Sequence, residues 1–183
     1  MEFMNDLWIP ILVGTFVLQF ASTMAWMVLP HHFDDHATVP GEEDLMDWVG
    51  DQNIPAGSYM FPYPETAAEM NSKEHQDRYA KGPRGTLHVY KPVSMPLNIL
   101  KTLLYFLCTV GTIGYITHVA CPPGAETTTF LRVFRIAGTI GILTYASSGV
   151  LDRIWFVRRM WTTIVDGAVY GLIVGIVFAV LWP

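Results

Sequence analysis

Long apolar runs alternate with polar segments along the chain of 183 residues. Four such runs occupy residues 7–29, 97–120, 131–151 and 161–182. About 20 predominantly apolar residues suffice for a helix to cross a bilayer. The pattern therefore predicts an all-α membrane protein with four transmembrane helices, the first within residues 1–29 and the other three within residues 96–183.

The third run combines basic residues with a short uncharged stretch. Arg132 and Arg135 stand at its start, and its uncharged part, residues 136–150, is only about 22 Å long at the helical rise per residue. Because the hydrocarbon core is about 30 Å thick, both arginine side chains are expected to extend to the lipid headgroups.

Residues 30–95, between the first two runs, are polar and rich in turn-forming residues. The stretches GEEDLMDWVG and SKEHQDRYAKG are typical of short helices, each with a glycine placed to end it. SYMFPYP and TLHVYKP are expected to be extended, because prolines interrupt the first and the second alternates apolar with polar residues. Pairing of these two stretches as a hairpin would make a small α+β cap inserted between helices 1 and 2.

Composition agrees with a membrane protein. Hydrophobic residues make up 51% of the chain and charged residues 15%, below the roughly 25% usual in globular domains. Most acidic residues lie in the polar segment and account for the net charge of -5, which does not favour nucleic-acid binding. The expected partners are the lipid bilayer and other membrane-protein subunits.

Basic residues are distributed unevenly between the two ends of the predicted helices. Most of the 11 lie in the polar segment, at the start of the second helix, or in the connection between the third and fourth helices. Basic residues favour the cytoplasmic side of a membrane. We therefore expect residues 30–95 to be cytoplasmic and both termini to lie on the opposite side.

Small residues mark one face of the third and of the fourth helix. Gly167, Gly171 and Gly175 recur at every fourth position, and Gly141 belongs to a similar stripe in the third run. Such faces allow two helix backbones to approach closely. These glycines are predicted helix-packing residues, either within the chain or between subunits.

Asp166 is the one acidic residue within the four apolar runs. An acid at that depth is costly in a membrane and normally faces a partner inside the bundle. The sequence predicts an intramembrane ion pair with Arg153, Arg158 or Arg159, which would join the third and fourth helices. The alternative is a proton or cation relay, or a ligand contact.

A cluster of potential metal ligands follows the first run, in the stretch LPHHFDDH. If the helix continues, His32, Asp35 and His36 share one face at i, i+3 and i+4, where imidazole and carboxylate groups suit a divalent transition metal. The alternative is a polar exit from the membrane, whose side chains meet water or Arg158 and Arg159. No cofactor other than such a metal is predicted.

Established catalytic signatures are absent from the sequence. It contains no nucleophile elbow, phosphate-binding loop, HExxH motif or paired-carboxylate motif. No catalytic residue is therefore predicted, and the protein is not expected to be an enzyme.

Several stretches carry a resemblance to known proteins. They are MVLPHHFDD, IPAGSYMFP, KGPRGTLHVYKP, VFRIAGT, and DGAVYGL with a terminal LWP. In these the chain resembles an uncharacterised family of small four-span bacterial inner-membrane proteins. The resemblance implies a multi-pass protein of the bacterial inner (cytoplasmic) membrane, so that the termini would be periplasmic. It implies no reaction and no site residues.

Three hypotheses of function follow. The first is a non-catalytic accessory or assembly subunit of a larger bacterial membrane complex, of a bioenergetic (respiratory or photosynthetic) kind. The second is a small transporter or ion-handling membrane protein that uses Asp166 and the His/Asp cluster at the cytoplasmic end of helix 1. The third is a membrane-embedded metalloenzyme.

Overall fold

The computed structural model describes residues 2–156 and 159–183, and within them the chain forms two compact units. The helical unit runs up to residue 37 and continues from residue 95 to residue 183. The inserted unit comprises residues 38–94. Residues 30–37, predicted as part of the cap, belong to the helical unit.

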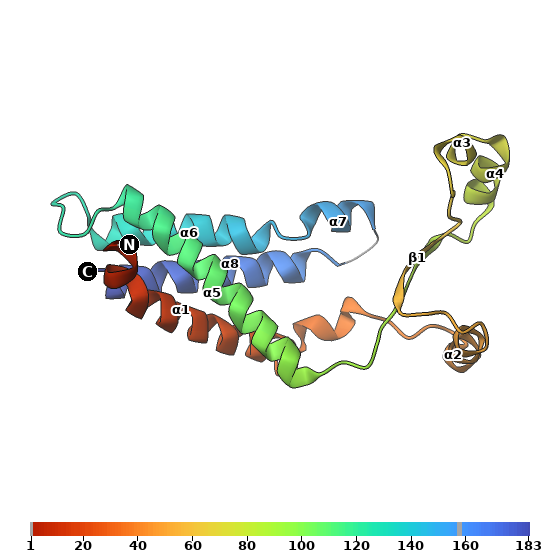
Figure 1. Cartoon of the computed structure of the whole chain (residues 1–183), viewed down its shortest axis with the longest axis horizontal. Helices are drawn as coiled ribbons and strands as arrows, with labels where there is room; N and C mark the ends of the chain where they lie inside the picture. Colours follow the sequence, from red (N-terminus) through yellow and green to blue (C-terminus); the bar gives the residue numbers. More distant parts are fainter. Residues whose placement is uncertain (1, 157–158) are drawn as a thin grey trace. The chain divides into compact units, whose positions relative to one another are not determined.

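Among the described residues, three helices are long and apolar enough to cross a membrane (Figure 1). They are α1 (Glu2–Met27), α5 (Met95–Ala120) and α8 (Trp161–Leu181). These helices coincide with three of the four apolar runs. The chain is therefore a mostly helical membrane protein with a small two-stranded sheet.

The third apolar run forms a shorter helix, α6 (Phe130–Ala146), of 17 residues. Thr129 caps its start, because its hydroxyl accepts a hydrogen bond from the backbone N–H of Arg132. Past the end of the helix, Gly149 adopts a φ of 72°, which redirects the chain before α7 (Val150–Trp155). At about 25 Å, α6 is marginal as a span, and the number of four spans stays a prediction.

The helices of this unit form a bundle in which α1 packs against α5 and α8, and α6 packs against α5 and α8. The contact between α6 and α8 is the most intimate. A Cβ atom added at Gly167 would overlap the backbone of Ala146, and one added at Gly171 would overlap the backbone of Ile142. Neither position accommodates any side chain without moving the helices apart.

Two further glycines extend the same seam. A Cβ at Gly141 of α6 would lie 2.8 Å from the Cα of Gly171, and one at Gly175 would lie 3.0 Å from the Cα of Gly138. Beside the seam, large side chains fill the space between all four helices. Those with almost no exposed surface include Leu7, Leu18, Val110, Ile113, Val133, Val174 and Phe178.

The connections sort to opposite ends of the bundle (Figure 1). Both chain ends and the turn joining α5 to α6 lie at one end. At the other end lie the short 3-10 helix η1 (Pro30–Asp35), which follows α1, together with the start of α5 and α7. The end of α1 and the start of α8 therefore lie at the same level.

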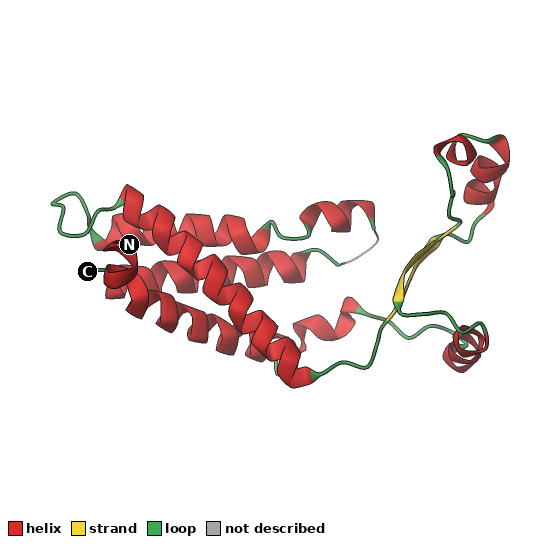
Figure 2. Cartoon of the chain, in the orientation of Figure 1, coloured by secondary structure: helices red, strands yellow, loops and turns green. Residues whose placement is uncertain are grey.

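The inserted unit contains α2 (Glu42–Asp51), β1 (Gly57–Phe61), α3 (Ala67–Met70), α4 (Lys73–Lys81) and β2 (Gly85–Val89). The strands pair antiparallel, with α3 and α4 between them in the chain (Figure 2). Pairing of the two extended stretches is thus confirmed. Within this unit, all of which the structure describes, only Pro62 and His75 are buried.

Candidate functional site

The candidate site begins where α1 ends. Leu29 is extended, and Pro30 starts the tight turn of η1. Residues three apart lie directly above one another in a 3-10 helix. His32 and Asp35 therefore meet, and the Nδ1 atom of His32 lies 2.5 Å from Oδ2 of Asp35.

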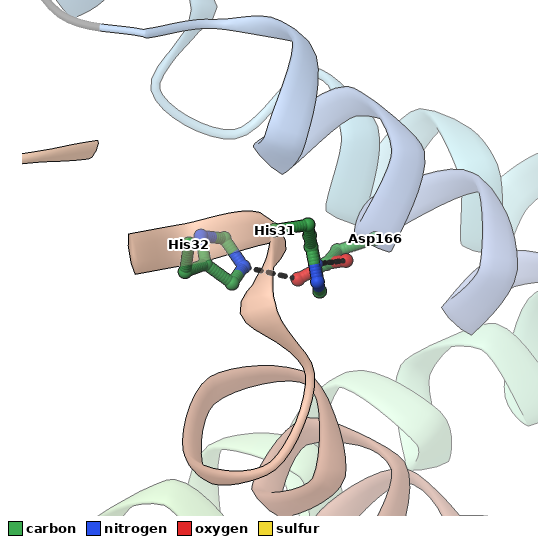
Figure 3. A group of neighbouring side chains, drawn as sticks. All are labelled: His31, His32 and Asp166. Carbon is green, nitrogen blue, oxygen red and sulfur yellow. Dashed lines mark hydrogen bonds and ion pairs between the residues drawn. The ribbon is translucent and has the colours of Figure 1, made fainter. Parts of the chain in front are cut away.

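Asp166 of α8 places its carboxylate between two histidines (Figure 3). Oδ1 lies 2.9 Å from Nε2 of His31, and Oδ2 lies 2.8 Å from Nε2 of His32. Only 12% of the Asp166 side chain and 3% of the His32 side chain are exposed. The carboxylate thus bridges two imidazoles in a region with little access to water.

His32 lies between two carboxylates, one at each ring nitrogen. An ionised carboxylate only accepts hydrogen bonds, so this placement favours the imidazolium form of His32, in which both ring nitrogens donate. Burial lowers the pKa of His32, but hydrogen bonds and charges from Asp35 and Asp166 outweigh that effect and raise the pKa above its usual value.

Further contacts hold this arrangement in place. The ring of Trp26 stacks on His32, with centroids 3.9 Å apart and planes 8° apart. The Thr162 hydroxyl, in the first turn of α8, donates to Asp35 over 3.3 Å. Burial raises the pKa of Asp35, but hydrogen bonds from His32 and Thr162, with the charges of His32 and Arg159, lower it overall. The 3-10 turn is therefore fastened to α8 through both acids.

A cavity of about 330 Å³ adjoins the cluster within the helical unit. It is lined by residues of α1, η1, α5, α6, α7 and α8, among them His32, Tyr105, Tyr145, Arg153, Asp166 and Tyr170. The lining thus combines ionisable side chains with aromatic rings and with small residues. The cavity offers space for water or a small ligand next to the Asp166 carboxylate.

The structure differs from the predicted ion pair of Asp166. Arg153 donates instead to the backbone carbonyls of Gly149 and Arg159. The Arg159 guanidinium lies 3.3 Å from a carboxylate oxygen of Asp34. Arg158 lies outside the described residues. The physical reason is that a backbone turn brings histidines to Asp166 at short range. Arg153 binds backbone carbonyls instead, and Arg159 binds the exposed Asp34.

The predicted metal triad is also arranged differently. The structure brings His32 and Asp35 together but leaves His36 exposed, because η1 ends at Asp35 and His36 is extended with a φ of -129°. His31 takes the third place in the cluster. Its signal in the sequence was its position beside His32, directly after the first span and at the membrane level of Asp166.

Ligand atoms suitable for a metal converge at this point. Among the described residues, Nε2 of His31, Nε2 of His32 and a carboxylate oxygen of Asp166 all lie within 4.8 Å of one another. No family model, curated protein or solved structure matches this chain. Fold and site together define a helical membrane protein with a histidine–aspartate cluster at one end of its bundle.

Proposed function

We propose that this protein is a small ion-handling membrane protein, which binds a cation between Asp166 and the histidines that follow helix 1. One observation carries the proposal: the carboxylate of Asp166 bridges His31 and His32 at the end of the bundle. An acid within a membrane helix is rarely retained without a function or a partner. Here its partners are themselves ionisable and adjoin a cavity, which favours exchange of a cation over a fixed ion pair.

The proposed setting is a bacterial inner membrane that the chain crosses four times. In this topology α6 is a span in addition to α1, α5 and α8. Two observations support this topology. α6 packs along the glycine seam against α8, which is a helix of spanning length. Both chain ends lie at the same end of the bundle, as an even number of spans requires (Figure 1). The positive charges then make η1 and the inserted unit cytoplasmic.

Flux in vesicles tests the proposal. The protein is reconstituted with a pH-sensitive dye or a metal-sensitive dye inside, and the rate of cation entry is compared between wild type and Asp166→Asn. The matched control is Asp6→Asn, because Asp6 also pairs with a histidine, His118, but over 3.4 Å and with 41% of its side chain exposed. We expect Asp166→Asn to abolish entry and Asp6→Asn to leave it unchanged. Equal flux in all three proteins would refute the proposal.

A second candidate function is an accessory or assembly subunit of a larger bioenergetic membrane complex. The observation that favours it is the surface of the inserted unit, which exposes many large apolar side chains although it has almost no core. These are Val39, Met46, Trp48, Met60, Phe61, Tyr63, Met70, Tyr79, Tyr90 and Val93. Apolar surface of this extent is typical of a protein-binding region.

Purification of the tagged chain in a mild detergent tests the second candidate. We expect a stoichiometric partner that is lost when Trp48 and Tyr90, which are 52% and 79% exposed, are replaced by serine. The control is the pair Leu104→Ser and Val180→Ser on the helical unit. A lone monomer or homodimer in every preparation would exclude an accessory role.

A further inference from the structure

We infer that His31, His32 and Asp166 bind a divalent transition-metal ion of the Zn²⁺ type, and that Asp35 positions His32 for this purpose. The inference rests on the proposed function, because it names the class of cation that the site takes. It differs from the triad expected from helical spacing, since it includes His31 and omits His36. Its basis is the placement of ligand atoms from two distant parts of the chain.

The distances fit a metal site after small movements. Zn²⁺ binds imidazole nitrogen and carboxylate oxygen at about 2.0–2.2 Å, so ligand atoms in a tetrahedral site lie roughly 3.3–3.5 Å apart. The two nitrogen–oxygen distances are 2.9 and 2.8 Å, and all three ligand atoms lie within 4.8 Å. A side-chain movement of about 1–2 Å would open the hydrogen bonds and admit the ion between the three groups.

Asp35 supplies the outer support that metal-binding histidines usually have. A ligating imidazole almost always donates its other N–H to a carboxylate, a carbonyl or water, which fixes the tautomer and aims the free nitrogen at the metal. Nδ1 of His32 donates to Asp35, so Nε2 is the nitrogen that faces Asp166. Thr162 holds Asp35 in turn, and the stacked ring of Trp26 restricts rotation of the imidazole.

Charge also favours a divalent ion. Two carboxylates, Asp35 and Asp166, with two neutral imidazoles carry a double negative charge, which a divalent ion neutralises. The ion replaces the protons that His31 and His32 hold between Nε2 and Asp166, and these protons pass to solvent or to the free ring nitrogen of His31. Because a membrane boundary disfavours net charge, a neutral complex is the stable form there.

The ligand set selects the class of ion. Two imidazoles and one carboxylate suit zinc, cobalt, nickel or iron, whereas calcium and magnesium prefer sites made of oxygen alone. Three protein ligands leave a fourth position open, as in zinc sites where water or a substrate binds. His32 and Asp166 line the cavity of about 330 Å³, so the open position has room for an exchangeable ligand.

Direct binding to the full-length protein tests the inference. The protein in detergent is dialysed against a chelator and titrated with Co²⁺, whose visible absorption reports tetrahedral coordination, and with Zn²⁺ by calorimetry in two buffers of different protonation enthalpy. We expect one ion per chain, a tetrahedral cobalt spectrum and release of protons. No stoichiometric binding of either metal would overturn the inference.

Matched variants locate the ligands. We expect His31→Gln and Asp166→Asn to abolish stoichiometric binding, and His36→Gln and His118→Gln to bind like wild type. Of the two ligand variants, His31→Gln is less able to disturb folding, because 20% of the His31 side chain is exposed against 12% of the Asp166 side chain. Unchanged binding in His31→Gln, or loss of binding in His36→Gln, would overturn the assignment.

Asp35→Asn separates positioning from ligation. An amide at residue 35 can still accept a hydrogen bond from His32 but lacks the charge, so we expect one ion per chain with affinity about 10- to 100-fold lower. The cobalt spectrum should stay tetrahedral. Complete loss of the spectrum would show that Asp35 is a ligand, and wild-type affinity would show that it has no role; either result overturns its assignment.

The same experiments distinguish this inference from the proposed function. If no metal binds but Asp166→Asn still abolishes entry of protons into vesicles, ion handling stands and the metal site falls. If one metal binds per chain but Asp166→Asn leaves flux unchanged, the metal site stands and ion handling falls.

Discussion

Replacing Gly171 by alanine would place a methyl group against the backbone of Ile142, in the seam between α6 and α8. Backbone atoms cannot rotate away as a flexible side chain can, so the two helices would have to separate locally. Gly111 of α5 provides the matched control, because a Cβ there would meet nothing within 4 Å. Both positions are helical glycines inside apolar helices.

The comparison isolates the steric effect. Alanine is favoured over glycine in a helix by about 0.5–1 kcal/mol, and this gain applies to both variants. Overpacking a well-filled contact costs about 1–3 kcal/mol, and this cost applies to Gly171→Ala alone. We therefore expect Gly111→Ala to be as stable as wild type or slightly more stable, and Gly171→Ala to be about 1–3 kcal/mol less stable than Gly111→Ala.

Unfolding in mixed micelles, followed by circular dichroism as the fraction of denaturing detergent rises, gives the two free energies. Gly167→Ala should lower the stability as Gly171→Ala does. It should also weaken metal binding, because a Cβ at residue 167 would push α8 away from Ala146 directly beside Asp166. Equal free energies of unfolding for Gly171→Ala and Gly111→Ala would refute the close approach of α6 to α8.

Three further predictions concern packing, polar contacts and the metal. Phe178 is fully buried whereas Phe20 is 65% exposed, so Phe178→Ala should lower the free energy of unfolding by about 3–5 kcal/mol and Phe20→Ala should change it little. The Tyr145 hydroxyl lies 2.8 Å from that of Thr109, so Tyr145→Phe should cost about 0.5–1.5 kcal/mol, against no change for the exposed Tyr115→Phe; equal stability of the two would contradict the contact. Zn²⁺ at about 100 times its dissociation constant should raise the free energy of unfolding by about 2.7 kcal/mol, and excess chelator should remove that gain.

The long apolar runs predicted α1, α5 and α8 because a membrane-spanning helix needs about 20 predominantly apolar residues. The mean hydropathy over that length stays high even where single residues are polar. The helix in the third run is shorter than the run itself. The run contains Gly149, whose φ of 72° requires a left-handed conformation, and α6 already stops at Ala146. The pair of serines and the glycine after Ala146 were the local signal for this break.

The sequence identified most residues of the candidate site, but it did not show which of them would contact one another. Spacing arguments relate residues three or four apart on one helix, but the structure ends α1 at Met27 and continues as a 3-10 turn. That change removed His36 from the cluster and brought in His31. The contact of His32 with Asp166 joins residues 134 positions apart, and no periodicity in a single sequence reports such a pair.

The cluster joins the residues that follow α1 to the start of α8. This arrangement has a consequence for how the protein is inserted into a membrane. Chains are synthesised from the N-terminus, and early segments leave the ribosome well before late ones. His31 and His32 therefore reach the membrane while α8 has not yet been made. Until Asp166 arrives, His32 can pair with Asp35 only. A chain truncated before α8 lacks Asp166 and therefore the bridge between the two histidines. Occupancy of the cluster would thus mark a molecule in which α8 has been inserted beside the end of α1.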